Sequence, residues 1–293
     1  MNAGGCTSGA FVNGVENIPA FEKTIGKKLG VILFFTHWFN PFPTDEVKAI
    51  INNGSLPMLT WEPWITDKEG TLNAIISGKH DDYMLNFLKA AKEIGQPIFL
   101  RFAHEMNGDW YPWSGVSNND EGKGPELYIK AWKHLHALIY NNVKATNIKL
   151  VWCVNHESRP PEKWNEFKAY YPGDEYVDWL ALDGYNWGYE KWQTFDEVFL
   201  EAYKEISAIS NKPLMIGEFS SAGSGSSERE NKSNWIKDAF EKIISKYEKV
   251  KIFCWFNINK ERDWRVDSSA ESEAAMRCAL QKDGILDKIQ NYQ

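Results

Sequence analysis

The chain has 293 residues, a length that fits either two average domains or one large α/β barrel. Its formal net charge is −7 and no stripe of lysine and arginine is evident, so we do not expect a nucleic-acid partner. Apolar residues make up 43% of the chain and aromatic residues 14%, which excludes a disordered or collagen-like protein. The longest apolar runs fall far short of the roughly 20 residues of a membrane-spanning helix, so no membrane partner is expected either.

Short apolar runs alternate with longer amphipathic segments along the chain. Eight strand-and-helix repeats without a Pro-, Ser- or Gly-rich linker predict a single (β/α)8 TIM barrel, one α/β domain over residues 1–293. The predicted strands are residues 8–13, 30–35, 57–61, 97–104, 148–155, 177–184, 213–218 and 250–257. The clearest predicted helices are residues 44–52, 81–94, 125–140, 195–210 and 230–247.

In a parallel barrel, functional groups lie at the carboxyl ends of the strands and in the loops that follow them. The predicted fourth strand ends at Glu105 and the predicted seventh at Glu218. The two-residue repeat of a strand puts Glu105 on one face with Arg101, so both acids are expected to point into the barrel mouth. Arg101 either keeps Glu218 ionised or stabilises the barrel interior. Two converging carboxylates are the minimum set for glycosidic bond cleavage, although a single Glu at such a place more often caps a helix.

Two segments carry a resemblance to a known family. Residues 101–113 read RFAHEMNGDWYPW and residues 216–219 read IGEF, and together they resemble glycoside hydrolase family 26, a family of clan A retaining β-glycanases. The resemblance extends over essentially the whole chain. It implies that Glu105 is the catalytic acid/base and Glu218 the nucleophile. If their carboxyl groups lie about 5 to 5.5 Å apart, Glu218 attacks directly and the configuration is retained.

The same resemblance implies roles for residues around the two acids. His104 holds the position before the acid/base, which many clan relatives fill with Asn, and would bind sugar near the cleavage point. Tyr185 resembles the family tyrosine that hydrogen-bonds the nucleophile. Trp255 resembles the sugar platform of the clan.

The chain contains 14 tryptophans, more than one core usually needs, so several are expected to face a ligand. Sugars present C–H patches that stack on flat aromatic faces, and a polysaccharide cleft needs a row of such faces. The candidates follow strand ends and are Trp38, Trp61, Trp64, Trp110 and Trp113.

Other motifs are weaker. Asn155 and Glu157 at the end of the fifth predicted strand mimic the fourth-strand pattern, and we interpret this segment as a cleft wall with Asn155 as a substrate-binding candidate. The His-Glu pair of the fourth strand begins like the zinc motif HExxH, but Gly108 stands where the second ligand would be. No phosphate-binding Gly loop, nucleophile elbow or calcium loop is evident. The expected chemistry therefore needs no metal and no cofactor.

The four cysteines have no Cys-x-x-Cys spacing. Cys153 and Cys254 lie in apolar, strand-like runs and are expected to be buried free thiols. Cys6 and Cys278 could form a disulfide.

The sequence thus predicts a retaining endo-hydrolase of a β-linked polysaccharide. Residues 34–38, FFTHW, look closer to the β-1,3-1,4-glucanase (lichenase) branch of the family than to its β-1,4-mannanases, and a smaller branch acts on β-1,3-xylan. The alternatives are an endo-β-1,4-mannanase, and a non-catalytic barrel that holds glycan or serves a protein partner. Because such polymers cannot enter a cell intact, we expect secretion, with further modules of a larger enzyme as partners.

Overall fold

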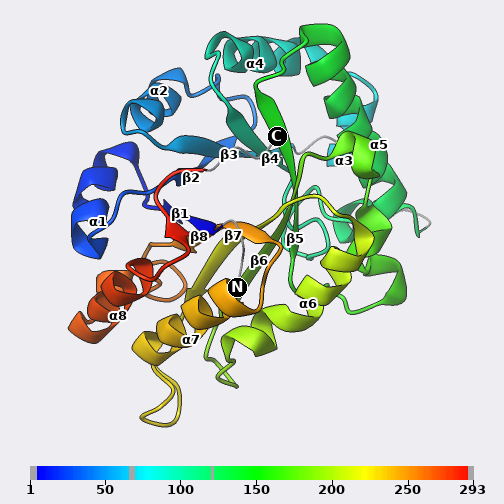
Figure 1. Ribbon diagram of the computed structural model, residues 1–293. Coiled ribbons are helices and arrows are strands. Elements are labelled where there is room, and N and C mark those ends of the chain that lie inside the picture. The colour runs from blue at the N-terminus through cyan, green and yellow to red at the C-terminus, as the bar shows by residue number, and fades with distance from the viewer. Residues whose placement is uncertain (1–4, 66–69, 120–121, 290–293) are drawn as a thin grey trace. The chain divides into compact units, whose positions relative to one another are not determined.

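The computed structural model describes residues 5–65, 70–119 and 122–289, and the predicted alternation of strands and helices is confirmed (Figure 1). The strands are β1 (Cys6–Phe11), β2 (Val31–His37), β3 (Leu56–Glu62), β4 (Ile98–Phe102), β5 (Ile148–Asn155), β6 (Trp179–Asn186), β7 (Leu214–Ser221), β8 (Val250–Phe256) and a short β9 (Ile285–Leu286). The helices are α1 (Ile18–Ile25), α2 (Thr44–Asn52), α3 (Thr71–Ile76), α4 (Asp81–Glu93), α5 (Gly124–Ala137), α6 (Phe195–Ile209), α7 (Lys232–Ser245) and α8 (Ala270–Leu280).

The strand order defines the fold. Hydrogen-bonded neighbours follow the order β2-β3-β4-β5-β6-β7-β8-β1, and β1 also pairs with β2, so the order closes on itself as a (β/α)8 TIM barrel. β6 and β7 are buried along their whole length, and both begin with apolar residues, WLAL and LMI, as strands covered on both faces do. Within the described ranges no helix is both long enough and apolar enough to cross a bilayer.

The chain divides into two compact units. One comprises the chain up to Phe34, Asn52–Leu56 and the chain from Leu182 onward. In this unit Gly9 of β1 pairs with Cys254 of β8, and a Cβ on Gly9 would lie only 2.6 Å from the Cys254 Sγ atom. Glycine is therefore required there for close strand packing. Helices α7 and α8 of the same unit lie side by side (Figure 1).

The other unit comprises Phe35–Ile51 and Pro57–Ala181. Here β3, β4 and β5 pair in parallel, with Leu100 of β4 opposite both Leu59 and Leu150. Helix α4 has two aspartates in its first turn, and their negative charges stabilise the helix through its positive N-terminal dipole end. After the helix, Gly95 has a φ of 70°. Glycine adopts this left-handed conformation without strain, so the chain can turn there.

The end of β4 differs from the prediction. The strand was expected to reach residue 104 but ends at Phe102, and Ala103 and Glu105 have φ values of 47° and 52°. The predicted two-residue alternation that would put Glu105 on the face of Arg101 is therefore wrong, because left-handed residues break the pleat. The Ala103 N–H still donates to the Trp61 carbonyl and the Glu105 N–H to the Cys153 carbonyl, so hydrogen bonds to β3 and β5 hold this backbone.

The four cysteines all lie in the described part of the chain, and none of them forms a disulfide. Cys153 and Cys254 are buried thiols outside any disulfide, as expected. The possible disulfide between Cys6 and Cys278 is not formed, since Cys6 is a buried free thiol and Cys278 an exposed one.

Glu22 of α1 is a buried acid that links three parts of its unit. Its Oε1 accepts hydrogen bonds from the Leu29 N–H and the Asn53 amide, both at 3.0 Å, and its Oε2 accepts one from Lys28 at 2.5 Å. Replacing Glu22 with Ala is expected to lower the free energy of unfolding by about 3 kcal/mol, because buried donors lose their acceptor. Urea denaturation measures this. The exposed Glu248→Ala variant should change stability by less than about 0.5 kcal/mol, and an equally small loss for Glu22→Ala would contradict the expectation.

Candidate active site

The carboxyl group of Glu105 is held from both sides. Its Oε2 accepts a hydrogen bond from the Trp110 indole N–H at 2.9 Å, and its Oε1 accepts one from the Asn155 amide at 3.0 Å. A Cβ on Gly108 would lie 2.5 Å from the Trp110 ring, so glycine at this place lets the indole fold back over the loop. Glu105 is 6% exposed. The acid is therefore fixed in orientation while it keeps a small accessible surface.

Asn107, which the sequence analysis did not single out, anchors this arrangement. It is completely buried, its amide donates to the Asn155 carbonyl at 2.9 Å, and its Oδ1 accepts from the Asn155 N–H at 2.9 Å. The Asn165 amide donates to the Asn107 carbonyl at 2.9 Å. Asn107 thus joins the loop after β4 to the end of β5 and positions the residue that bonds Glu105. The only sequence signal was an Asn-Gly pair, which reads as an ordinary turn.

His104 is buried directly before the acid. Its Nε2 lies 3.1 Å from the Tyr111 hydroxyl, and the Trp113 indole N–H donates to the His104 carbonyl at 2.7 Å. Burial, and secondarily the positive charge of Arg101, hold the pKa of His104 well below its ordinary value, so the imidazole is neutral. Its buried Nδ1 has no hydrogen-bond partner among the described residues.

The neutral state of His104 predicts a pH dependence of stability. Between the ordinary pKa of about 6.5 and the lower pKa of the folded state, the unfolded chain binds a proton at this residue that the folded chain does not, so stability is lost as the pH falls through that window. The expected loss is up to about 1.4 kcal/mol per pH unit below 6.5. Urea denaturation at several pH values should show a shallower dependence for His104→Asn than for the wild type. Identical dependence in the two proteins would contradict the assignment.

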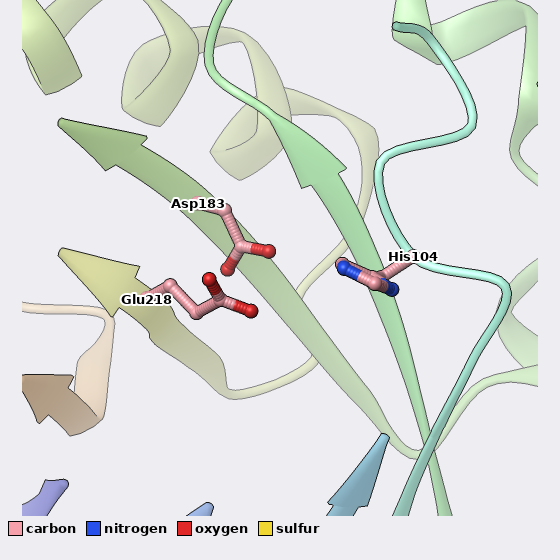
Figure 2. Close-up of side chains that lie close together, drawn as sticks. All are labelled: His104, Asp183 and Glu218. Atoms are coloured by element: carbon pink, nitrogen blue, oxygen red, sulfur yellow. The ribbon is translucent and has the colours of Figure 1, made fainter. Parts of the chain in front are cut away.

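Glu218 lies in β7 and is 5% exposed. The Tyr185 hydroxyl of β6 donates to the Glu218 Oε2 at 2.5 Å. Asp183, also in β6, is completely buried, and carboxylate oxygens of Asp183 and Glu218 lie within 4.8 Å of each other. Figure 2 shows the two acids extending from neighbouring strands to the same side. The pairing of β7 with β8 shifts register between Ile216 and Phe219, an irregularity of the kind that re-aims a side chain.

Arg101 is completely buried in β4. Its Nε donates to the Thr60 hydroxyl at 2.8 Å, and one terminal nitrogen lies 3.6 Å from the Cys153 Sγ. Its guanidinium carbon is 5.5 Å from the centre of the Phe35 ring. These contacts give Arg101 a place in the packing of β3, β4 and β5.

The aromatic residues predicted to contact sugar differ in how much of each ring is exposed. Trp61 is stacked between Trp38 and Phe87, with ring centres 4.8 and 4.1 Å away, and has no exposed surface. Trp113 is also fully buried and stacks on Tyr111 at 4.2 Å. The prediction that Trp61 and Trp113 offer faces to a sugar is therefore wrong, because neighbouring rings already cover them.

Two of the four remaining candidates keep a large exposed surface. Trp64 is 43% exposed and Trp110 39%, so a sugar can reach both rings. Trp38 and Trp255 are almost completely buried, at 5% and 2%. The Trp255 indole N–H donates to the Trp264 carbonyl at 3.0 Å.

One exposed ring near Glu218 was missed by the sequence analysis. Tyr189 is 63% exposed and stacks on Trp187 with ring centres 5.7 Å apart. Trp187 in turn lies 5.7 Å from Tyr185, which bonds Glu218. The Arg262 guanidinium also lies over the Tyr189 ring, 3.9 Å from the ring centre. Nothing in the local sequence distinguishes this tyrosine from a surface residue of a loop.

The chain is similar to known proteins in sequence and in fold. A sequence profile described as glycosyl hydrolase family 26 matches residues 15–266. Endoglucanase H of Acetivibrio thermocellus is 40% identical over 270 residues, which covers 90% of this chain and 29% of that protein. A mannan endo-1,4-beta-mannosidase of Bacillus subtilis strain 168 is 28% identical over 214 residues, which covers 71% of this chain and 49% of that protein. The chain therefore spans less than half the length of either relative.

The solved structure of Bacillus subtilis mannanase man26 has the same fold, with a TM-score of 0.69, 17% identity and coverage of 98% of this chain and 88% of that one. The family profile extends over most of the sequence and includes both Glu105 and Glu218. The chain belongs to glycosyl hydrolase family 26.

Proposed function

We propose that the protein is a retaining endo-β-glycanase in which Glu105 is the acid/base and Glu218 the nucleophile. The observation that carries the proposal is the way each carboxyl group is held, that of Glu105 in the loop after β4 and that of Glu218 within β7. Glu105 is fixed by Trp110 and Asn155, and Glu218 by Tyr185. Such positioning contributes to catalysis because it removes the cost of orienting the group during reaction. The names of both relatives, an endoglucanase and an endo-mannosidase, support an endo-acting enzyme.

The proposed reaction has two steps. In the first, Glu218 attacks the anomeric carbon while Glu105 transfers its proton to the departing glycosidic oxygen, which leaves a glycosyl ester on Glu218. In the second, Glu105 takes a proton from water as that water attacks the same carbon and frees Glu218. Two inversions give net retention. The neutral His104, with its unpartnered Nδ1, is proposed to bind a sugar hydroxyl beside the cleaved bond. The scheme uses only these side chains and calls for no metal or cofactor.

The proposed substrate is β-1,3-1,4-glucan. The higher identity to an endoglucanase, 40% against 28% for the mannosidase, supports a glucan. Endo-β-1,4-mannanase is the second candidate, since a mannan endo-1,4-beta-mannosidase matches 71% of the chain.

Polymer hydrolysis tests these assignments. The purified protein is incubated with barley β-glucan, glucomannan, galactomannan and carboxymethylcellulose, and reducing ends and viscosity are followed. A rapid fall in the viscosity of β-glucan is the expected result, with the first products in the β configuration by proton NMR. Hydrolysis of mannans alone would establish the second candidate. Failure to release reducing ends from any polymer would favour a barrel that only binds glycan.

We also propose that the protein acts outside the cell as one module of a larger enzyme. Its chain covers only 29% of Endoglucanase H, which is consistent with a modular parent. Immunodetection of the native protein in culture medium is the expected result. Detection in cytosol alone would contradict secretion.

A further inference from the structure

A third buried carboxylate lies at a strand end, outside the two proposed catalytic residues. Glu62 is the last residue of β3 and is 6% exposed. Its Oε2 accepts a hydrogen bond from the Trp64 indole N–H at 3.3 Å and lies 3.3 Å from the His37 Nδ1. His37 is the last residue of β2, and its side chain is 65% exposed. One buried acid thus contacts two exposed rings that come from neighbouring strand ends.

The Trp64 ring is fixed but accessible. It stands nearly perpendicular to Tyr111 and to Trp113, at 80° and 79°, with ring centres 5.7 and 5.4 Å away. Its N–H is held by Glu62, and the His37 ring centre lies 6.3 Å from its own. Despite these contacts Trp64 remains 43% exposed. A ring that is already ordered loses little conformational freedom when a ligand stacks on it.

The same contacts connect Trp64 to the acid/base. Tyr111, which packs against Trp64, also contacts two residues beside Glu105. Its hydroxyl lies 3.1 Å from the His104 Nε2, and its ring centre lies 6.2 Å from that of Trp110. Trp110 donates to Glu105. Trp64 therefore lies one layer of aromatic side chains away from the residues around Glu105. A sugar on Trp64 would occupy a different subsite from the sugar at the cleaved bond.

We propose that Trp64 and His37 form an accessory sugar subsite and that Glu62 is its positioning residue. Trp64 stacks on the apolar face of one pyranose ring of the polymer, and His37 exchanges hydrogen bonds with the hydroxyls of that ring. Glu62 holds both rings in place, because its carboxylate is shared between them. The inference rests on the proposed function, since a polymer that reaches Glu105 must continue past its neighbours.

Oligosaccharide kinetics test the subsite. The values of kcat/KM are measured for a long and a short oligosaccharide of whichever polymer the wild type degrades, and their ratio is compared between variants. Trp64→Ala is expected to lower the ratio of long to short by about tenfold, with the change in KM and not in kcat. Glu62→Ala should act in the same direction. Glu62→Gln keeps an oxygen that can accept the indole hydrogen bond and should recover most of the ratio.

A double variant separates positioning from other roles. If Glu62 acts through Trp64, the combined Glu62→Ala and Trp64→Ala protein should lose no more than Trp64→Ala alone. Additive losses would overturn the positioning role. The matched control is Glu126→Ala, an exposed acid on α5 that pairs with Lys130, and it should leave the ratio unchanged.

The two proposals can fail separately. An active wild type whose chain-length ratio does not respond to Trp64→Ala or His37→Ala would overturn the subsite and leave the proposed function in place. If the wild type hydrolyses no polymer, the proposed function fails, and affinity electrophoresis in gels that contain β-glucan or glucomannan then tests the subsite. Equal retardation of wild type and Trp64→Ala would overturn it there too.

Discussion

Replacing Glu218 with Gln is expected to lower kcat by about 10⁴-fold or more, because an amide cannot form the glycosyl ester of the first step. Gln has nearly the same size and still accepts the hydrogen bond that Tyr185 donates, so the fold should be unchanged. Release of reducing ends from the polymer that the wild type degrades measures the loss. Circular dichroism confirms that the variant is folded.

The control for this variant is Glu248→Gln, which alters an exposed acid of the same unit and should retain full activity. Glu218→Ala offers a second test, since azide can enter the space left by the carboxylate and attack the sugar directly. An α-glycosyl azide product is expected for a retaining β-glycanase. A fully active Glu218→Gln protein would remove Glu218 as the nucleophile.

Replacing Glu105 with Ala is expected to lower kcat/KM on the polymer by about 10² to 10⁴-fold, the usual contribution of general acid catalysis. The sugar leaving group of a polymer needs a proton, whereas an aryl leaving group of low pKa does not. The loss should therefore be much smaller for formation of the glycosyl-enzyme from an activated aryl glycoside. Pre-steady-state release of the phenol measures that step.

The matched control is Glu157→Ala. Glu157 follows β5 in a segment that resembles the one around Glu105, but it is exposed and pairs with Arg159 at 3.5 Å. Its replacement should change kcat/KM by less than about tenfold. A larger loss for Glu157→Ala than for Glu105→Ala would reverse the assignment of the acid.

The strand pattern was readable from the sequence because each barrel strand is short, apolar and followed by an amphipathic segment. Strand β5 begins and ends where the sequence predicts, at Ile148 and Asn155. The turn after Phe102 was not readable, since left-handed φ values at Ala103 and Glu105 depend on hydrogen bonds to β3 and β5. The local sequence pattern does not show which distant residues will form those hydrogen bonds.

The candidate site shows the same division between local and distant information. The position of Glu105 after β4 follows from the order of elements, but its contact with Asn155 joins residues 50 positions apart in the chain. Burial of Trp61 depends on stacking by Phe87, which comes from α4. A tryptophan near a strand end looks the same in the sequence whether another ring or open solvent faces it.

The loop after β4 is bonded to β5 and also within itself. Trp110 reaches back five residues to Glu105, and Trp113 reaches back nine residues to the His104 carbonyl. Contacts between such near neighbours in the chain close only short loops and so cost little chain entropy to form. If Glu105 acts as proposed, these short-range contacts should help to keep its carboxyl group aligned between turnovers. On the proposed function, the rate of polymer binding should then be set by diffusion of the glycan and not by ordering of this loop.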